Sequence, residues 1–335
     1  MINNNLKTIL QLLNLYFKSS FIIALVGIFI AFYLGGFYGA YIVTLLAILE
    51  ISLSFDNAVV NAKILLNMEP KWQDRFIIFG VPFAVFGMRF IFPVLIVSIA
   101  SGVNVVDTFN IAINNPTKYH HILQSVENLI YSFGGSFLMM VFLDFLFDDA
   151  KEYRWIKIIE SSKTVKTLSQ VNNIELIISI SIGLFIISLT KDYSIALAYF
   201  GGILLHSIIS SIDNLFSVDG IRNGMMGLIY LEVLDASFSF DGVIGAFALS
   251  SDIFLIMIGL GIGAMFVRSL TIYFVKNKTL TKFKYLEHGA NWAIMALSFI
   301  MLCKIFIEIN ELIVGTIGIT FIGLSLWYSI NESKD

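Results

Sequence analysis

The chain has 335 residues, of which 58% are hydrophobic and 13% are charged, and its formal net charge at pH 7 is -3. Soluble domains carry about twice that share of charge, so these values and the mean hydropathy of +0.86 exclude a cytosolic enzyme and a disordered chain. The net negative charge argues against a nucleic-acid partner, and the single cysteine, Cys303, cannot form an internal disulfide. We therefore expect an all-α, polytopic transmembrane helix bundle whose surroundings are the lipid bilayer.

Ten apolar stretches approach the roughly 20 residues that a helix needs to cross a bilayer. In chain order they cover residues 20–37, 38–62, 76–100, 122–147, 174–190, 195–212, 225–249, 253–275, 289–307 and 312–330. The segment before them, Leu6–Phe17, is too polar to span and is expected to lie at the membrane interface.

The basic residues orient these spans. With the N-terminus in the cytoplasm, sixteen of the 21 Lys and Arg residues fall on the cytoplasmic side, and only Lys118 and Lys191 fall outside. Cytoplasmic loops of membrane proteins carry such an excess of positive charge. The pattern predicts ten spans with both termini in the cytoplasm, and it makes residues 148–173 the longest cytoplasmic linker.

An internal repeat links the second and seventh spans. Residues 49–56 read Leu-Glu-Ile-Ser-Leu-Ser-Phe-Asp, and residues 234–241 read Leu-Asp-Ala-Ser-Phe-Ser-Phe-Asp, with five identities in eight positions. If each repeat unit contains five spans, the two copies cross the membrane in opposite orientations, which is the plan of many secondary transporters. We expect a first membrane half at 1–173, comprising four spans and the linker, and a remainder at 174–335 whose inverted repeat centres on 225–249.

The two motif helices contain five carboxylates, and the third and eighth spans each contain an arginine. The acids are Glu50, Asp56, Glu232, Asp235 and Asp241, and the arginines are Arg89 and Arg268. A charged side chain at the centre of a bilayer costs about 3 kcal/mol or more, so such residues are expected to face a cavity or a partner. The arginines could pair with the acids while no cation is bound, although both could also be purely structural.

Helical periodicity sorts these residues by face. One face of the first copy carries Glu50, Ser54, Asn57 and Asn61, and one face of the second carries Glu232, Asp235, Ser239 and Gly242. Asp56 and Asp241 each lie six residues after the central acid of their copy, about 120° away on a regular helix. Either each motif helix is broken locally, which we favour, or each of these aspartates reaches a different neighbour.

Carboxylate, hydroxyl and amide oxygens are hard ligands that suit Mg²⁺, Ca²⁺ and Mn²⁺. The Gly259–Gly263 run looks like a dinucleotide-binding loop only superficially; inside an apolar span it indicates close helix packing. Glu127, Glu287 and Glu308 lie at span ends and are expected to be interfacial.

The sequence Ser54-Phe55-Asp56-Asn57 resembles the signature of the tellurium-resistance TerC family of membrane proteins. Residues 49–63, 86–89, 231–247 and 286–290 are similar to one bacterial branch of that group, catalogued as a domain of unknown function and resembling the LysE-type exporter superfamily. The resemblance implies a bacterial inner-membrane protein that exports Mn²⁺ or a similar divalent cation. By this resemblance the expected metal ligands are Glu50, Asp56, Asn57, Asp235 and Asp241.

We therefore expect a secondary exporter that works by alternating access at a midplane carboxylate site. The supporting residues are expected to be Ser54, Asn61, Ser239, Glu232, Arg89 and Arg268. An exchanger for Ca²⁺ or another cation and a non-transporting accessory subunit in metal-stress resistance remain alternatives. Known nucleotide-binding, metalloprotease and nucleophile motifs are absent from the sequence, so neither an enzyme nor a resident cofactor is expected.

Overall fold

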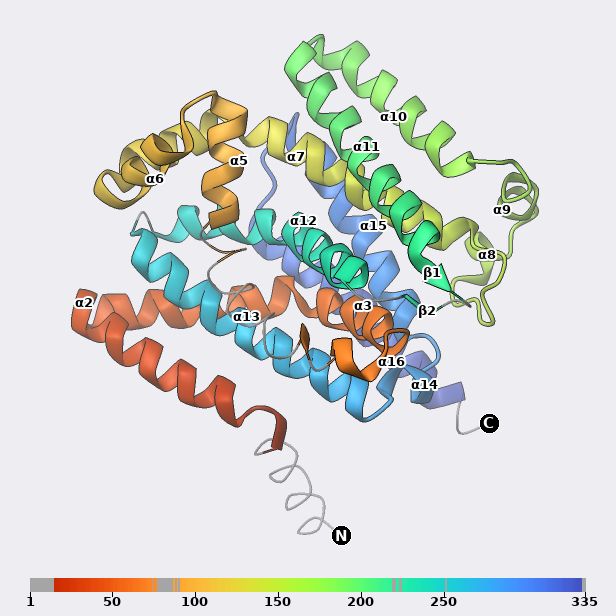
Figure 1. Ribbon diagram of the computed structural model, residues 1–335, viewed down its shortest axis with the longest axis horizontal. Helices are drawn as coiled ribbons and strands as arrows, with labels where there is room; N and C mark the ends of the chain where they lie inside the picture. Colours follow the sequence, from red (N-terminus) through yellow and green to blue (C-terminus); the bar gives the residue numbers. More distant parts are fainter. Residues whose placement is uncertain are drawn as a thin grey trace.

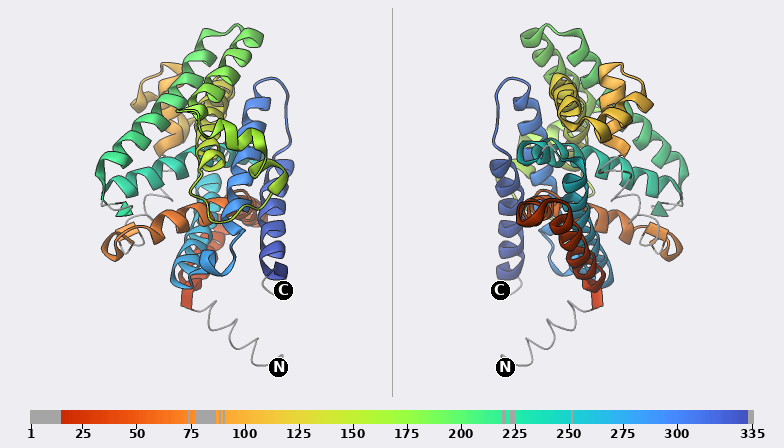
Figure 2. Two further views of the ribbon diagram at one scale, coloured as in Figure 1. Left: turned by 90° about the vertical axis from the view of Figure 1, so that its right-hand side faces the viewer. Right: turned by 90° about the vertical axis from the view of Figure 1, so that its left-hand side faces the viewer.

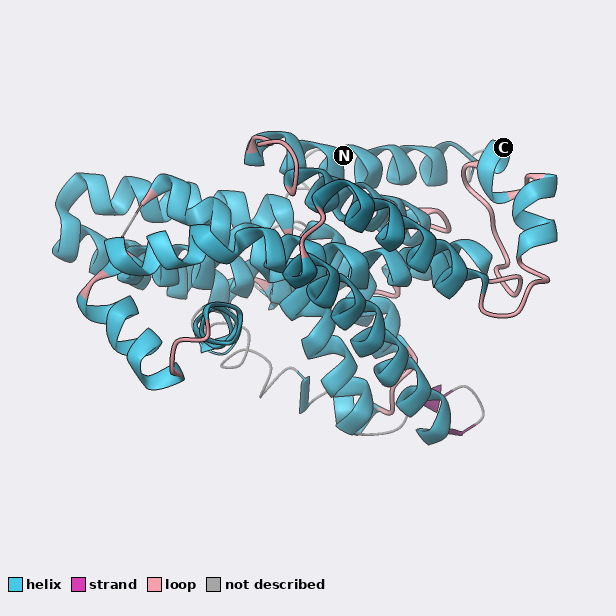
Figure 3. Ribbon diagram, turned by 90° about the horizontal axis from the view of Figure 1, so that it is seen from above, coloured by secondary structure: helices cyan, strands magenta, loops and turns pink. Residues whose placement is uncertain are grey.

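The computed structural model describes residues 15–73, 75–76, 87, 89, 91–218, 221–222, 225–250 and 252–332. Helices dominate this part of the chain, as Figure 3 shows, and they confirm the expected all-α bundle. The elements are α2 (Lys18–Leu53), α3 (Phe55–Leu66), α5 (Phe92–Ser101), α6 (Val105–Asn114), α7 (Pro116–Phe147), α8 (Lys157–Glu160), α9 (Lys163–Leu168), α10 (Ile174–Thr190), α11 (Tyr193–Phe216), β1 (Ser217–Val218), β2 (Ile221–Arg222), α12 (Met225–Leu249), α13 (Ile253–Lys276), α14 (Thr279–Lys282), α15 (Leu286–Lys304) and α16 (Glu311–Glu332). The two short strands pair antiparallel, with Ser217 opposite Arg222.

Most expected stretches coincide with helices. The bounds of α10 and α12 are those predicted, and α13, α15 and α16 begin and end within three residues of their stretches. Within the third stretch, 76–100, residues 77–86, 88 and 90 lie outside the described residues, as do residues 6–14 of the expected interfacial segment Leu6–Phe17.

Five of the described helices are long and apolar enough to cross a membrane: α2, α7, α11, α13 and α15. Counting α5 and α6 together as one bent span gives six. The sequence predicts ten because it divides α2 into two spans and also counts α10, which is shorter, and α12 and α16. Glu232, Asp235 and Asp241 make α12 more acidic than an ordinary span.

A sharp reversal divides α2 into two limbs. Gly35 and Gly36 have non-helical backbone angles, and Gly36 has a φ of 60°, which glycine adopts without steric cost. Figure 1 shows the two limbs folded back on one another in a V. The reversal separates the first two expected spans, and the second limb carries the first motif.

The segment after α5 differs from the expected outer loop. It forms a second helix, α6, whose axis is turned by 119° from that of α5. Gly102, with a φ of 70°, ends α5, and the side chain of Asn104 caps α6 by accepting a hydrogen bond from the Val106 amide.

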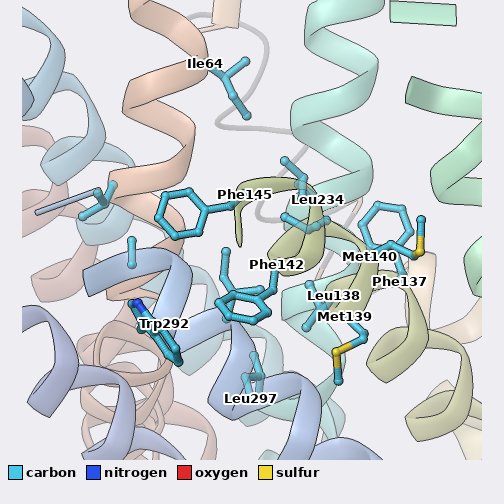
Figure 4. Close-up of a cluster of buried hydrophobic side chains, with 14 of the residues drawn as sticks. Ile64, Phe137, Leu138, Met139, Met140, Phe142, Phe145, Leu234, Trp292 and Leu297 are labelled. Atoms are coloured by element: carbon cyan, nitrogen blue, oxygen red, sulfur yellow. The ribbon is translucent and has the colours of Figure 1, made fainter. Parts of the chain in front are cut away.

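Small residues and hydroxyl groups bring the central helices close together. On α7, Ser132 and Ser136 donate hydrogen bonds to carbonyl oxygens of α11, and Ser298 of α15 donates to the Gly135 carbonyl at 2.7 Å. Phe142 and Trp292 meet edge to face at 5.2 Å within the largest hydrophobic cluster, drawn in Figure 4. Helix α7 is therefore held between α11 and α15, which fixes the frame around the motif helices.

The two ends of the bundle are formed by different elements. In Figure 1, α8, α9, α14 and the strand pair gather on the right, whereas the reversal of α2, α6 and the turn between α12 and α13 lie on the left. Figure 2 shows α16 and α11 at opposite edges. The right-hand end carries the linker and loops that are rich in Lys and Arg.

Candidate ion-binding site

Glu50, on the second limb of α2, is 1% exposed. The Ser54 hydroxyl donates a 2.7 Å hydrogen bond to Glu50 Oε1, and Arg89 donates to the same oxygen. Two glycines leave room for this carboxylate: a Cβ at Gly242 would lie 2.9 Å from Glu50 Oε2, and one at Gly263 would lie 2.4 Å from Glu50 Cβ. Helices α12 and α13 therefore approach Glu50 through positions that have no side chain.

Arg89 connects the two copies of the motif. Its guanidinium pairs with Glu50 of the first copy, and its Nη1 atom lies 3.8 Å from Asp235 Oδ2 of the second copy. Arg89 and Glu50 are almost fully buried, and the Asp235 side chain is 13% exposed. The structure thus brings two of the five expected ligands to one positive charge, as expected for a counter-ion arginine.

Arg268 lies in the same electrostatic neighbourhood but makes a different contact. It donates a 2.7 Å hydrogen bond to the Phe76 carbonyl, and its guanidinium lies 3.3 Å from the centre of the Phe76 ring. Glu232 and Asp235 interact with it electrostatically. Three acids and two arginines therefore share this interior, which leaves one formal negative charge.

The first motif helix is broken where the periodicity predicts. Helix α2 ends at Leu53, Ser54 has φ of -106° and ψ of 17°, and α3 begins at Phe55. Asp56 lies in the first turn of α3, is 4% exposed and accepts a hydrogen bond from the backbone N–H of Asn57. A negative charge in this turn is favoured by the helix dipole.

The second motif does not show the expected break, because α12 is one helix from Met225 to Leu249. The positions of its Ser239 and Asp241 side chains lie outside the described structure, so these two predictions stay predictions. Gly242 stands where the first copy has Asn57, and the close approach to Glu50 gives the physical reason for a glycine there.

Asn57 and Asn61 are buried polar residues with unmet hydrogen-bonding capacity. Asn57 is 0% exposed and Asn61 4% exposed, and within the described residues neither amide atom of Asn57 nor Oδ1 of Asn61 has a hydrogen-bond partner. Buried polar groups normally find partners, since an unpaired one costs about 1–3 kcal/mol. The side-chain oxygens of Asn57 and Asn61 are therefore suited to coordinate a cation.

The four expected ligands whose side chains the structure describes, Glu50, Asp56, Asn57 and Asp235, do not form one ready-made metal centre. Among the described residues, no group of three or more His, Cys, Asp or Glu side chains has the arrangement of a metal site. Glu50 and Asp235 meet at Arg89, whereas Asp56 and Asn57 follow the break on α3. The arrangement can hold a cation at Glu50 and Asp235 only if the guanidinium moves away.

Sequence reasoning missed a further buried carboxylate, Glu160, in the 148–173 linker. Glu160 is 1% exposed, accepts a 2.8 Å hydrogen bond from Trp292 Nε1 and lies 3.0 Å from His288 Nδ1. Burial opposes ionisation, but the contacts with His288 and Trp292 outweigh it and lower the pKa of Glu160 to about 2. Its sequence neighbours gave no signal, because both partners lie more than a hundred residues away.

The acids expected at the membrane interface either form an ion pair or line a cavity. Glu287 pairs with Lys63 of α3. Glu127 and Glu308 line a cavity of about 810 Å³ between α2, α7, α12, α15 and α16, together with Lys304.

A family model described as "Protein of unknown function (DUF475)" matches residues 55–335. Neither a curated protein nor a solved structure matches the chain.

Proposed function

We propose that this chain, which belongs to the family of proteins of unknown function DUF475, is a secondary transporter that exports a divalent metal cation, with Mn²⁺ as the proposed substrate. The observation that carries the proposal is the bridge from Glu50 through Arg89 to Asp235, which joins acids of both motif copies inside an apolar bundle. Buried charges at such depth in a membrane protein typically mark an ion pathway. The resemblance to TerC and LysE-type proteins supports the same class of function and a bacterial inner-membrane location.

The donor chemistry favours a hard cation. Glu50 and Asp235 supply carboxylate oxygens, and Asn57 supplies an amide oxygen without a partner among the described residues. Mg²⁺, Ca²⁺ and Mn²⁺ prefer such ligands. Asp56 and Asp241 complete the proposed ligand set, with Ser54, Asn61, Ser239 and Glu232 as supporting residues.

In this proposal Arg89 acts as a tethered substitute for the transported cation. With the site empty, the guanidinium pairs with Glu50 and Asp235 and offsets one of their two negative charges; an entering divalent cation displaces it and takes over the two carboxylates. Release then occurs when the arginine returns or when the carboxylates take up protons. The two carboxylates therefore face a positive charge in both the empty and the loaded state, which limits the free-energy difference between these states.

The packing of the motif helices supports an inverted repeat with alternating access. Helix α3 of the first motif packs on α15, and α12 of the second packs on α7. Since α7 and α15 correspond to each other in the proposed repeat, these contacts are reciprocal. Movement of one half against the other would expose the site to each side in turn.

A vesicle experiment tests the function. Purified protein is reconstituted with a metal-sensitive dye inside, and Mn²⁺, Ca²⁺ and Mg²⁺ are added separately. We expect Mn²⁺ flux with the unmodified protein and with Asp107→Asn, an exposed acid of α6, but none with Asp56→Asn or Asp241→Asn. Equal flux in all four proteins would refute the site, and absence of flux for every cation would refute transport in favour of an accessory role.

A further inference from the structure

Three elements meet at the beginning of α15. Lys63, in the last turn of α3, forms an ion pair with Glu287, in the first turn of α15. The next residue, His288, lies against Glu160 of the linker. Two adjacent residues of α15 therefore tie it to the first motif helix on one side and to the linker on the other.

The linker contact centres on the buried Glu160 carboxylate. Beyond Trp292 and His288, the Glu160 carboxylate accepts hydrogen bonds from the amides of Trp155 and Ile156 at 3.1 and 3.3 Å. The His288 ring meets the Phe145 ring edge to face at 5.2 Å, so the contact reaches the end of α7. The linker is thus fastened across the ends of α7 and α15.

The opposite half of the bundle contains a cavity. The cavity of about 810 Å³ is lined by the first half of α7, including His120 and Glu127, and by the end of α15, including Lys304. Leu49 and Leu53 of α2 line its inner wall on either side of Glu50 in the sequence.

We propose that the Lys63–Glu287 pair and the contact of Glu160 with His288 and Trp292 form the gate that closes the cytoplasmic side of the transport path. The proposal rests on the proposed function, and it assigns the structure to the outward-open state, with the 810 Å³ cavity as the exit vestibule. The excess of Lys and Arg in the linker and after α13 identifies the gated end as cytoplasmic. To admit a cation from the cytoplasm, α15 must separate from α3 and from the linker.

Cysteine accessibility tests this gate without relying on metal transport. In a Cys303→Ser background, Ala62→Cys places a reporter on α3 beside Lys63, at a position that is 0% exposed. A membrane-impermeant maleimide is applied to inside-out vesicles, and the labelling rate is measured. We expect slow labelling in the parent, an increase of about tenfold or more with Glu160→Gln and a smaller increase with Lys63→Ala, whose ion pair is partly exposed, because each variant removes a contact that opposes opening.

Two further variants control for a nonspecific effect of linker mutations and for misfolding. Glu152→Gln changes an exposed acid of the same linker and should leave the labelling rate at the parent value. The exchange Lys63→Glu with Glu287→Lys restores an ion pair of reversed polarity and should restore protection, which a misfolded protein would not do.

Equal labelling rates in the parent, Glu160→Gln and Lys63→Ala proteins would overturn the gate, as would rapid labelling of the parent. Cation flux is a separate readout. Predicted labelling without flux in reconstituted vesicles would refute the proposed function while leaving the closed contact and its opening established.

Discussion

Gly263 of α13 lies directly against Glu50 of α2: a Cβ built at Gly263 would be 2.4 Å from Glu50 Cβ and 3.0 Å from the Ala47 carbonyl oxygen. Four residues earlier, Gly259 approaches Leu46 in the same way. The glycine run expected to serve helix packing does so, and it does so at the central carboxylate. The position of Glu50 is therefore set by α13 as well as by its own helix.

Gly263→Ala is expected to displace Glu50 and to destabilise the protein by about 1–3 kcal/mol, because the added methyl group has no space. Thermal unfolding in detergent measures the loss. Gly318→Ala on α16 is the matched control, since nothing lies within 4 Å of a Cβ there. An equal melting temperature for both variants would contradict the close approach at Glu50.

Arg89→Ala is expected to leave Glu50 and Asp235 without their counter-ion, a loss of about 3–5 kcal/mol for a buried pair. A divalent cation can replace the missing charge, so Mn²⁺ should raise the melting temperature of this variant more than that of the unmodified protein. Lys118→Ala, which removes an exposed positive charge, should respond to Mn²⁺ like the unmodified protein. Identical Mn²⁺ shifts in Arg89→Ala and the unmodified protein, or unchanged transport and pH dependence in the variant, would disprove the substitution of arginine for metal.

Asn57→Ala is expected to reduce Mn²⁺ transport while leaving the stability of the protein nearly unchanged. The amide makes no side-chain hydrogen bond within the described structure, so its removal relieves a buried unpaired group and offsets the small cavity that is left. The melting temperature should change by only a few degrees while Mn²⁺ flux falls by about tenfold or more, as expected for a stability–function trade-off. Undiminished flux in this variant would remove Asn57 from the ligand set.

The linker contact predicts a defined acid dependence. The pKa of Glu160 is lowered from 4.5 to about 2, so its ionised contact stabilises the folded protein fully above about pH 4.5 and loses that effect as the pH falls toward 2. The difference in melting temperature between the unmodified protein and Glu160→Gln should shrink as the pH falls from 4.5 toward 2, compared with its value at pH 5. A difference that stays constant down to pH 2 would show that the Glu160 charge does not stabilise the contact.

Much of the helical framework could be predicted from the sequence. Hydropathy gives α10 and α12 at the correct residues, and the 120° offset between Glu50 and Asp56 correctly indicates the break at Ser54. These features are local, since each depends on composition or helical phase within a few turns.

Features that depend on distant contacts could not be predicted. The ten residues of α6 include Asp107 and Asn110, so hydropathy assigned them to a loop. The burial of Glu160 depends on His288 and Trp292, far along the chain, and the cavity lined by Glu127 and Lys304 depends on how five helices pack. The need for glycine at position 242 likewise follows only from the approach of α12 to Glu50.

Calorimetric titration of the purified protein with Mn²⁺ tests most directly whether Glu50 and Asp235 bind the transported cation. We predict saturable binding to the unmodified protein and to Asp107→Asn, and loss of that binding in Glu50→Gln and Asp235→Asn. Binding of equal affinity in all four proteins would contradict the account.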